Sequence, residues 1–438
     1  MLVEFSVENY RSFQEKQTLS MVAAEDETML NSNTFPMPNT DNLRLVKSAV
    51  IYGSNASGKS NLLKAMQTLK NLVINSASRM QSGDKLPIEP FKLNSESPKQ
   101  PTTFEVIFIH KGTRYEYGVS ANQERIYEEW LIAYPNERQQ NWFSRQSMPD
   151  NSELQIDELY QWSFGKGLKG EKKIISKFVR YNSLFLSHAA QNNHPQLTEI
   201  FKFFSDQINF LIHGYTDIGF PLSILNKDSS LKQKFAKLIT EADIGISNIE
   251  IQIDPRLTSE ELSKMNPFHL QFINQKADLQ YMAEETLDTL EEFDVITIHK
   301  MNDSEEEIEF DITEESTGTQ RLFEIAGYWL YVLQKGEILI IDELDTSLHP
   351  VLSKALVKMF NDPEINKNNA QLIFTTHDTS LLDAEIFRPD QIWLTEKDKS
   401  MTKLYSLLDF RPREDESLQK GYLLGRYGAI PFINGLSI

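Results

Sequence analysis

The chain has 438 residues, 40% hydrophobic and 11% aromatic, which is the composition of a soluble globular protein with room for about two or three domains. It contains no cysteine, which excludes a disulfide framework, a thiolate metal site and a thiol nucleophile. The formal net charge of −19 argues against sequence-blind binding of nucleic acid across the surface. It does not exclude nucleic-acid binding in a local basic groove.

The N-terminal segment lacks the pattern of a targeting sequence. Its first residues, MLVEFSVENYRSF, alternate like a strand and lack the charged-then-apolar layout of a signal peptide. No apolar run reaches the length that spans a bilayer. We therefore expect a cytoplasmic protein with no membrane partner, and we predict strands at residues 2–8 and 16–23.

A glycine-bounded turn follows, in the stretch GSNASGKS of residues 53–60. An apolar run precedes it and the amphipathic stretch NLLKAM follows it, so the order is strand, turn and helix. The spacing G-x-x-x-x-G-K-S is the P-loop pattern. Gly53 and Gly58 permit a turn whose N–H groups point at the β-phosphate, and Lys59 brings positive charge to the β- and γ-phosphates. The hydroxyl of Ser60 can bind Mg²⁺, so we expect a nucleotide with its metal here; a chance match is the alternative, which this order of elements disfavours.

The region after the P-loop is predicted to begin with strands and to continue mainly as helices. Residues 102–135 contain TFEVIFI, TRYEYGVS and EEWLIAYP, which predict an antiparallel meander attached to the nucleotide core. Apolar residues recur at helical spacing in residues 196–242, including Ile208 and Leu211, and again in residues 279–293. One strand is predicted at SNIEIQI. The acidic stretch NDSEEEIEFD is typical of the solvated face of a hairpin, with a functional role as the alternative.

The stretch GEILIIDELDTSLHP, residues 336–350, combines a buried strand with acidic residues. The continuous apolar run 338–341 predicts a central parallel strand covered on both faces. It ends in Asp342 and Glu343, where a buried strand of an α/β sheet meets the nucleotide crevice. Because neighbouring side chains at a strand end diverge, one acid can hold the Mg²⁺ shell while the next polarises the attacking water. An acidic pair that only caps a strand is the alternative, and the upstream P-loop disfavours it.

Another apolar strand is predicted within LIFTTHD, residues 372–378, and His377 follows it. The histidine lies 35 residues after Asp342 (377 − 342), across one predicted helix, so it belongs to the next strand of a doubly wound sheet. An imidazole at that place can form a hydrogen bond with a γ-phosphate or with the attacking water. An ordinary loop histidine is the alternative.

The stretch EESTGTQRLFEIAGYW, residues 314–329, places Ser316 and Gly318 at the start of a predicted helix. A helix N-terminus with a small hydroxyl and a glycine is suited to binding phosphate. Because the chain already has a P-loop, we interpret this second phosphate-binding element as one that contacts the nucleotide of another subunit. A simple helix cap is the alternative, and the position 26 residues before Asp342 (342 − 316) favours the functional interpretation.

In this order, the P-loop, STGTQ, IIDELDTSLHP and TTH resemble the ABC-type ATPases of the SMC, RecF and OLD group. Within the group, the chain most resembles the prokaryotic AAA-type ATP-binding proteins of abortive-infection and anti-phage systems, through FSVENYRSF, ESTGTQRLFE, LDTSLHP and GRYGAIPFI. The resemblance covers residues 1–135 and 294–438. It implies an α/β fold, an ABC-type P-loop ATPase head with a mixed or parallel sheet plus the antiparallel meander, and no long coiled coil. We expect the two halves of the head at residues 1–140 and 294–438, and a mainly helical insertion at residues 141–293.

The resemblance implies ATP and Mg²⁺ as cofactors and ATP hydrolysis as the activity. The implied catalytic residues are Lys59, Glu343 as the general base and His377 as the switch histidine. Ser316 and Gly318 would contact the γ-phosphate across a head-to-head dimer. The remaining positions implied for nucleotide contacts are Arg11, Gly53, Asn55, Gly58, Ser60 and Asp345, and those implied for the metal are Ser60, Asp342 and Gln191.

Gln191 comes from the stretch LFLSHAAQNN, which we interpret as a strand leading into a polar loop. The chain departs from the pattern of the group at two places. Its signature reads Ser-Thr-Gly and not Ser-Gly-Gly, and His349 occupies a position often held by aspartate. Both departures leave the expected fold unchanged and bear on the rate of ATP turnover.

Two functions are consistent with these features. In the first, the chain is a regulatory ATPase of anti-phage defence, which responds to a phage-derived trigger and controls a separately encoded effector such as a nuclease. In the second, it is a DNA repair or recombination ATPase, like RecF or SMC, that clamps nucleic acid between dimeric heads. The acidity and the lack of a sustained heptad run favour the first. Only 61 residues follow His377 (438 − 377), fewer than an appended nuclease domain needs.

We expect a homo-oligomer whose heads close on ATP. The helical middle and the C-terminal segment GRYGAIPF are expected to help hold the effector, with Tyr427 and Phe432 as anchors. A tail that packs on its own core is the alternative for these aromatic residues.

Overall fold

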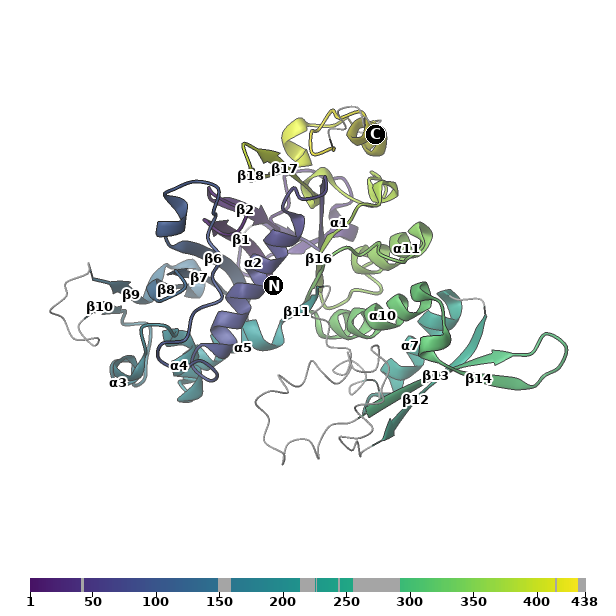
Figure 1. Ribbon diagram of the computed structural model, residues 1–438, viewed down its shortest axis with the longest axis horizontal. Coiled ribbons are helices and arrows are strands. Elements are labelled where there is room, and N and C mark those ends of the chain that lie inside the picture. Colours follow the sequence, from purple (N-terminus) through teal and green to yellow (C-terminus); the bar gives the residue numbers. More distant parts are fainter. Residues whose placement is uncertain are drawn as a thin grey trace. The chain divides into compact units, whose positions relative to one another are not determined.

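The computed structural model describes residues 1–40, 43–148, 159–212, 225, 227–242, 245–254, 292–413 and 416–431 (Figure 1). Its contacts divide the chain into two compact units. Unit 1 comprises residues 1–208, 360–363 and 371–438, and unit 2 comprises residues 209–359 and 364–370. The helix expected at residues 279–293 lies outside the described residues as far as residue 291, and its end is wrong, because Phe293 belongs to the strand Glu292–Lys300. The proposed anchor Phe432 also lies outside the described residues.

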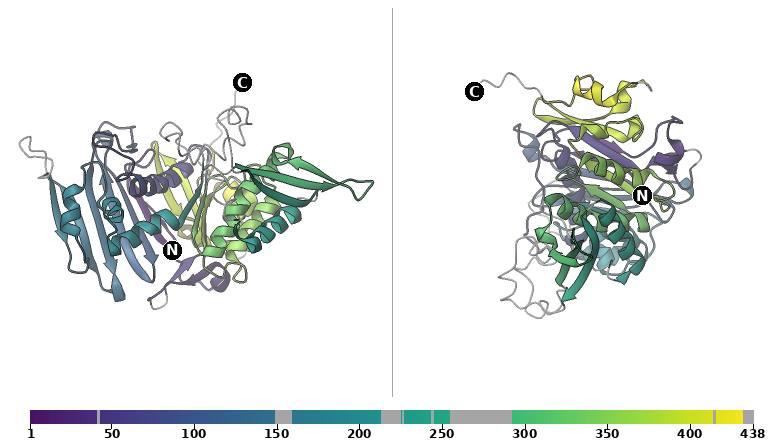
Figure 2. Two further views of the ribbon diagram at one scale, coloured as in Figure 1. Left: turned by 90° about the horizontal axis from the view of Figure 1, so that it is seen from below. Right: turned by 90° about the vertical axis from the view of Figure 1, so that its right-hand side faces the viewer.

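An antiparallel sheet forms one part of unit 1, with the strand order β10-β9-β8-β7-β6-β1-β2 (Figure 2). The alternation of apolar and polar residues that predicted the meander is the alternation that buries one face of each strand, as along β6, where Phe104, Val106 and Phe108 are buried. The meander expected over residues 102–135 is therefore confirmed. The strands are β1 (Leu2–Glu8), β2 (Gln17–Ser20), β6 (Thr102–His110), β7 (Thr113–Ala121), β8 (Ile126–Tyr134), β9 (Gln140–Ser147) and β10 (Tyr160–Phe164).

Parallel strands of unit 1 carry the P-loop. Strand β5 (Ser48–Gly53) is buried at every position and pairs in parallel with β16 (Gln371–Thr375) and β17 (Ile392–Asp398). Strand β18 (Met401–Ser406) pairs antiparallel with β17. Because β5 and β16 run in the same direction, the P-loop and the segment with His377 follow neighbouring strands at the same edge of the sheet, as expected.

The helices of unit 1 include one expected and one unexpected element. The P-loop leads into α2 (Lys59–Asn75), the helix predicted from NLLKAM. The stretch LFLSHAAQNN forms the helix α4 (Phe185–Gln191), so the predicted strand is wrong. The carboxylate of Glu129, buried on β8, accepts hydrogen bonds from the N–H groups of Phe185 and Leu186, and this long-range cap lets the short helix begin there. The other helices and short strands are α1 (Leu30–Asn33), β3 (Thr34–Pro36), β4 (Arg44–Val46), α3 (Lys172–Ile175), α5 (Pro195–Asp206) and α12 (Leu418–Leu423).

Unit 2 is built around α10 (Thr317–Lys335). Helix α7 (Ser229–Ala242) packs on it through the rings of Phe235 and Phe323, whose centroids are 5.1 Å apart. Strands β12 (Ile246–Asp254), β13 (Glu292–Lys300) and β14 (Glu307–Asp311) form an antiparallel sheet, and β13 and β14 make a long hairpin (Figure 1). The strand predicted at SNIEIQI and the solvated hairpin predicted at NDSEEEIEFD are both confirmed, since residues 301–310 are all exposed.

Strand β15 (Ile338–Ile341) is fully buried and leads to the acidic residues, as predicted. Strand β11 (Ile208–Leu211) lies beside it, and the N–H of Asp342 donates to the carbonyl of Leu211 at 3.1 Å. The assignment of Ile208 and Leu211 to a helix is therefore wrong, because α5 ends at Asp206 and the following residues pair with β15. Helix α11 (Pro350–Asn361) follows the acidic loop.

The expected α/β fold with an antiparallel meander is confirmed. The longest described helix, α10, has 19 residues, so no long coiled coil occurs among the described residues. Within residues 141–293 the described part contains α3, α4, α5 and α7 together with strands, and it belongs to both units. The domain boundaries at residues 140 and 293 stay predictions. None of the described helices could span a membrane.

Candidate functional site

The P-loop adopts a conformation that requires its two glycines. Gly58 starts α2 with φ 116°, and a Cβ atom there would lie 2.2 Å from Oγ1 of Thr402. A Cβ atom at Gly53 would lie 2.4 Å from the carbonyl oxygen of Thr395. Both separations are far below van der Waals contact, so only glycine fits at either end of the loop.

A network of hydroxyl groups holds the loop from the side of β17 and β18. Ser57 Oγ lies 2.7 Å from Thr395 Oγ1, and Thr402 Oγ1 donates to the carbonyl of Ser57 at 2.7 Å. Ser12 Oγ lies 2.8 Å from Thr402 Oγ1 and accepts from Asn61 Nδ2 at 2.8 Å. Sequence reasoning missed these supporting residues, because isolated serines and threonines far apart in the chain give no pattern that relates them to the loop.

Lys59 is folded over its own loop. Its side chain is buried, and Nζ donates to the carbonyls of Gly53 at 2.8 Å and Ser54 at 3.3 Å. Ser60 is partly exposed and Asn55 is exposed. The ammonium is thus held beside the loop that the P-loop pattern assigns to phosphate.

The start of α2 fits an anionic ligand. The N-cap residue Gly58 has no side chain that could cap this 17-residue helix, and no acidic residue occupies its first turn. Its first N–H groups and the positive end of its dipole therefore meet no carboxylate of the helix itself. The residues present fit a nucleotide phosphate, since the two glycines leave no room for a Cβ atom and the loop leads directly into the N-terminus of a long helix.

His377 is exposed directly after β16. Its neighbours are fixed, because Thr376 Oγ1 accepts from the N–H of Asp378 at 2.9 Å and Tyr52 Oη donates to the carbonyl of Asp378 at 2.9 Å. Thr375 pairs with Ile51 of β5, two residues before Gly53. The structure therefore places His377 and the P-loop at the ends of adjacent parallel strands, while a contact with phosphate stays a prediction.

The acidic residues lie in unit 2, at the end of β15. Asp342 is buried, and Glu343 is exposed with a left-handed backbone, φ 52°. The carbonyl of Glu343 accepts from the N–H of Thr346 at 3.1 Å, and its carboxylate accepts from Thr346 Oγ1 at 3.3 Å. A left-handed glutamate costs on the order of 1 kcal/mol, and such strain is concentrated at functional sites. Asp342, the expected metal ligand, is therefore buried, whereas Glu343, the expected general base, is exposed.

The signature residues and the acidic loop meet in unit 2. Ser316 caps α10, since its Oγ accepts from the N–H of Thr319 at 3.1 Å. A Cβ atom at Gly318 would lie 2.9 Å from the carbonyl oxygen of Ser347. The stretch STGT thus packs closely against the loop LDTSLHP, which contains Asp345. The helix-cap interpretation is confirmed for Ser316, and the γ-phosphate contact stays a prediction.

A residue next to the signature was missed by sequence reasoning. The carboxylate of Glu315 accepts from Thr297 Oγ1 and lies 2.7 Å from Nε2 of His299, both on β13. Its carbonyl accepts from Gln320 Nε2 at 2.9 Å. Glu315 therefore joins the β13–β14 hairpin to the turn that starts α10.

Two further predicted residues have other roles in the structure. The guanidinium of Arg11 forms an ion pair with Glu89, although the adjacent Ser12 supports the P-loop helix. Gln191 is exposed at the end of α4. Their contacts with nucleotide and metal stay predictions.

The C-terminal tail packs on its own core. The ring of Tyr427 is buried, lies 5.5 Å from that of Phe410, and its hydroxyl donates to Glu416 at 2.6 Å. For Tyr427, the structure therefore shows the alternative interpretation, in which the tail packs on its own core.

No group of three or more His, Cys, Asp or Glu side chains forms a metal cage among the described residues. A Mg²⁺ ion at a site of this kind is held through one or two protein ligands and the phosphates of the nucleotide, so Ser60 and Asp342 have suitable chemistry.

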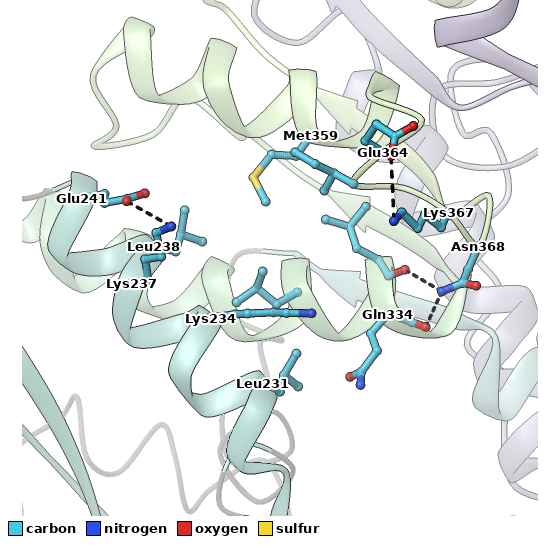
Figure 3. A pocket seen from close by; sticks show the side chains of 13 residues that line it. Leu231, Lys234, Lys237, Leu238, Glu241, Gln334, Met359, Glu364, Lys367 and Asn368 are labelled. Atoms are coloured by element: carbon cyan, nitrogen blue, oxygen red, sulfur yellow. Dashed lines mark hydrogen bonds and ion pairs between the residues drawn. The ribbon is translucent and has the colours of Figure 1, made fainter.

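A separate cavity of about 560 Å³ lies in unit 2, lined by side chains of α7 and α10, by Met359 of α11 and by residues of the segment 364–368 (Figure 3). Its rim carries exposed ion pairs, Lys237 with Glu241 and Lys367 with Glu364. The lining contains none of the predicted site residues.

Comparison with known proteins assigns the class. Residues 48–383 match the protein family described as AAA domain, putative AbiEii toxin, Type IV TA system, and the chain belongs to this family. The matched region contains the P-loop, the signature, the acidic pair and His377. The expected group, AAA-type ATPases of the abortive-infection kind, is confirmed at the level of this family.

Solved structures with a similar arrangement include the SMC head domain from Thermotoga maritima, at 12% identity and a TM-score of 0.39, covering 92% of this chain and 98% of that one. Another is an Smc head domain with an extended coiled coil bound to the C-terminal domain of ScpA, derived from Pyrococcus furiosus, at 11% identity and a TM-score of 0.39, covering 97% and 98% of the two chains. No curated protein matches the sequence.

Proposed function

We propose that the chain is an ATPase that binds ATP with Mg²⁺ at the P-loop and hydrolyses it. The observation that supports this most directly is the N-terminus of α2, which follows the buried strand β5 through a glycine-bounded turn and has no acidic residue in its first turn. That geometry presents backbone N–H groups and the positive end of a long helix to one point, as phosphate binding requires. Membership of an AAA family is consistent with it.

In the proposed reaction, Lys59 leaves the carbonyls of its loop and binds the β- and γ-phosphates. Bound Mg²⁺, held by Ser60 and Asp342, would neutralise charge on the phosphates. Glu343 accepts a proton from water, whose oxygen forms a bond to the γ-phosphorus while the bond to the bridging oxygen breaks. His377 steadies the γ-phosphate or the water, and the products are ADP and phosphate.

The signature residues would serve the nucleotide of a second copy. Ser316 and Gly318 lie at the start of α10, a 19-residue helix, and both residues are exposed or partly exposed. A chain with one P-loop and one such helix start can share each nucleotide between two copies in a head-to-head dimer. ATP favours that closed dimer only by binding it more tightly than the open form.

We assign the biological role to anti-phage defence, as the regulator of a separately encoded effector. Support comes from the description of the family, which includes a putative toxin of a toxin–antitoxin system, and from the net charge of −19, which is unsuited to broad nucleic-acid binding. A phage-derived trigger would shift the nucleotide state, and that state would release or activate the effector.

The biochemical part is tested by ATP binding and phosphate release. The unaltered chain should bind ATP and release phosphate in the presence of Mg²⁺, and Lys59→Ala should lose binding. Lys64→Ala, on the same helix but outside the G-x-x-x-x-G-K-S motif, is the matched control. Phosphate release that persists in Lys59→Ala would contradict the assignment of the site.

The cellular part is tested by co-expressing the chain with its genomic neighbour and challenging the cells with phage. Protection should require both proteins and should be lost in Lys59→Ala. Protection that survives this substitution, or that needs no neighbour, would rule out the proposed role while leaving the biochemical part intact.

A further inference from the structure

One edge of the three-stranded sheet in unit 2 has no pairing strand among the described residues. Strand β14 is the last strand in the order β12-β13-β14, and among the described residues it pairs only with β13. Glu307, Ile308, Glu309 and Phe310 are all exposed, and Ile308 and Phe310 are 40% and 36% accessible. A short strand with both faces exposed contributes little to the core of its own unit, and an open edge can template pairing with another strand.

The hydrogen-bond register shows which backbone groups face outward. The N–H of Met301 donates to the carbonyl of Glu306, so these residues form a hydrogen-bonded pair. Hydrogen-bonded pairs recur at every second residue, so the backbone groups of Ile308 and Phe310 also face β13, opposite His299 and Thr297. The backbone groups of Glu307 and Glu309 therefore face the open edge.

The side chains along this edge alternate in chemistry. Glu307 and Glu309 lie on one face, and Ile308 and Phe310 on the other. The only lysine of the hairpin, Lys300, stands opposite Glu307, but its ammonium is paired with Glu305 at 3.4 Å. The edge thus offers two carboxylates on one face and two apolar side chains on the other.

We propose that β14 is a docking edge for a strand of a partner protein in which basic and apolar residues alternate. The partner strand would donate to and accept from the outward backbone groups of Glu307 and Glu309 and place its basic side chains beside their carboxylates. A second copy of this chain is a poor occupant, because in-register pairing of two β14 strands sets these glutamates against their own kind.

The edge is connected to the signature. Strand β13, which holds β14, binds Glu315 through Thr297 and His299, and Glu315 precedes Ser316. A partner on the edge would therefore contact the element that positions the start of α10. That the partner is the effector rests on the proposed function; the docking edge itself does not.

The test uses a fluorescent heptapeptide of alternating lysine and valine and the full-length chain without nucleotide, with binding measured by anisotropy. The unaltered chain and Lys59→Ala should bind equally, so a failure of the ATPase assignment leaves this result unchanged. Charge reversal in Glu307→Lys/Glu309→Lys should weaken binding about tenfold or more, from the loss of two cross-strand pairs. Asp303→Lys/Glu306→Lys, in the turn of the same hairpin, makes the same change in net charge and should bind nearly as the unaltered chain does.

A second peptide separates strand pairing from simple charge attraction. The same sequence with an N-methyl group on every residue keeps every charge but has no backbone N–H group to donate to the ladder, and it should not bind. No binding of the unmodified peptide, equal loss in both double variants, or undiminished binding of the methylated peptide would each overturn the proposal. Unchanged circular dichroism of the variants excludes misfolding as the cause.

Discussion

At the scale of single residues, the two glycines of the P-loop show how a short motif depends on distant parts of the chain. The motif predicts that Gly58 turns the backbone toward phosphate. The structure adds that Thr402 of β18 and Ser12 of the N-terminal turn lie within 3.0 Å of where its Cβ atom would be. The glycine is therefore required by the ligand and by the packing of the unit.

Gly58→Ala should destabilise the protein and abolish ATP binding. The added methyl group combines an unfavourable φ with a clash against β18, which we expect to cost about 1–3 kcal/mol. Gly83→Ala is the matched control, because φ is also positive there (96°) but nothing lies within 4 Å of the new Cβ atom. Denaturant unfolding compares the two variants, and equal losses of stability would contradict the steric argument.

Glu343→Gln should keep ATP binding but slow hydrolysis by about 10²-fold or more, the range for loss of a general base. Glutamine retains the shape and the bond from Thr346, so the left-handed turn is expected to persist. Glu364→Gln, an exposed residue of the same unit, is the control. The measurement is single-turnover phosphate release, and turnover at the rate of the unaltered chain would remove Glu343 from the role of base.

At the scale of elements, helices α4 and α10 begin at different kinds of cap. Helix α10 is capped locally by Ser316, and the sequence predicts that start. Helix α4 is capped by Glu129 from β8, and burial raises the pKa of that carboxyl while the nearby Arg145 opposes the shift. A cap 56 residues away in the chain leaves no local signal.

The variant Ser316→Asp should separate the role of Ser316 as a helix cap from its proposed contact with the γ-phosphate. Aspartate is a good helix cap, so the stability of α10 should be retained, whereas its charge would repel a γ-phosphate of another copy. Hydrolysis should therefore fall while the affinity for ATP stays unchanged, and Ser316→Thr should retain activity. Full hydrolysis by Ser316→Asp would contradict the shared-site hypothesis.

The helix α4 should also make stability sensitive to acid. Burial, followed by the charges of Arg180 and Arg145, lowers the pKa of His188 from 6.5 to about 4, and its Nε2 lies 2.8 Å from Ser183 Oγ. Because the unfolded chain binds the proton more readily, this contribution is complete above about pH 6.5 and is lost as the pH falls toward 4. The loss is on the order of 3 kcal/mol.

His188→Gln should therefore flatten the fall in the free energy of unfolding between pH 6.5 and 4, even if the variant is less stable at neutral pH. His349→Gln, an exposed histidine, should leave the profile as it is. Denaturant unfolding across this pH range checks both, and an unchanged slope in His188→Gln would contradict the assignment.

At the scale of the whole molecule, the predicted functional residues are divided between the two units. The P-loop and His377 belong to unit 1, and the acidic pair and the signature belong to unit 2. Substitutions in either unit, such as Lys59→Ala and Glu343→Gln, are therefore expected to impair the proposed ATP turnover.

Glu343→Gln with ATP should form a head-to-head dimer, because binding without hydrolysis holds the closed state. Light scattering should show about a doubling of mass over the nucleotide-free form. The double variant Lys59→Ala/Glu343→Gln is the control and should show no change. The same increase in both variants would show that ATP at this P-loop does not drive association.

The sequence by itself determined the elements whose signals are local. Period-two alternation predicts the meander, a continuous apolar run predicts β15, and fixed spacing predicts the P-loop, because each reflects a few neighbouring residues. Tertiary structure decided the rest. Strand β11 replaces a predicted helix because it pairs with β15, α4 forms because Glu129 caps it, and Glu315 joins β13 to the signature. These contacts depend on residues far apart in the chain, whose proximity no local pattern encodes.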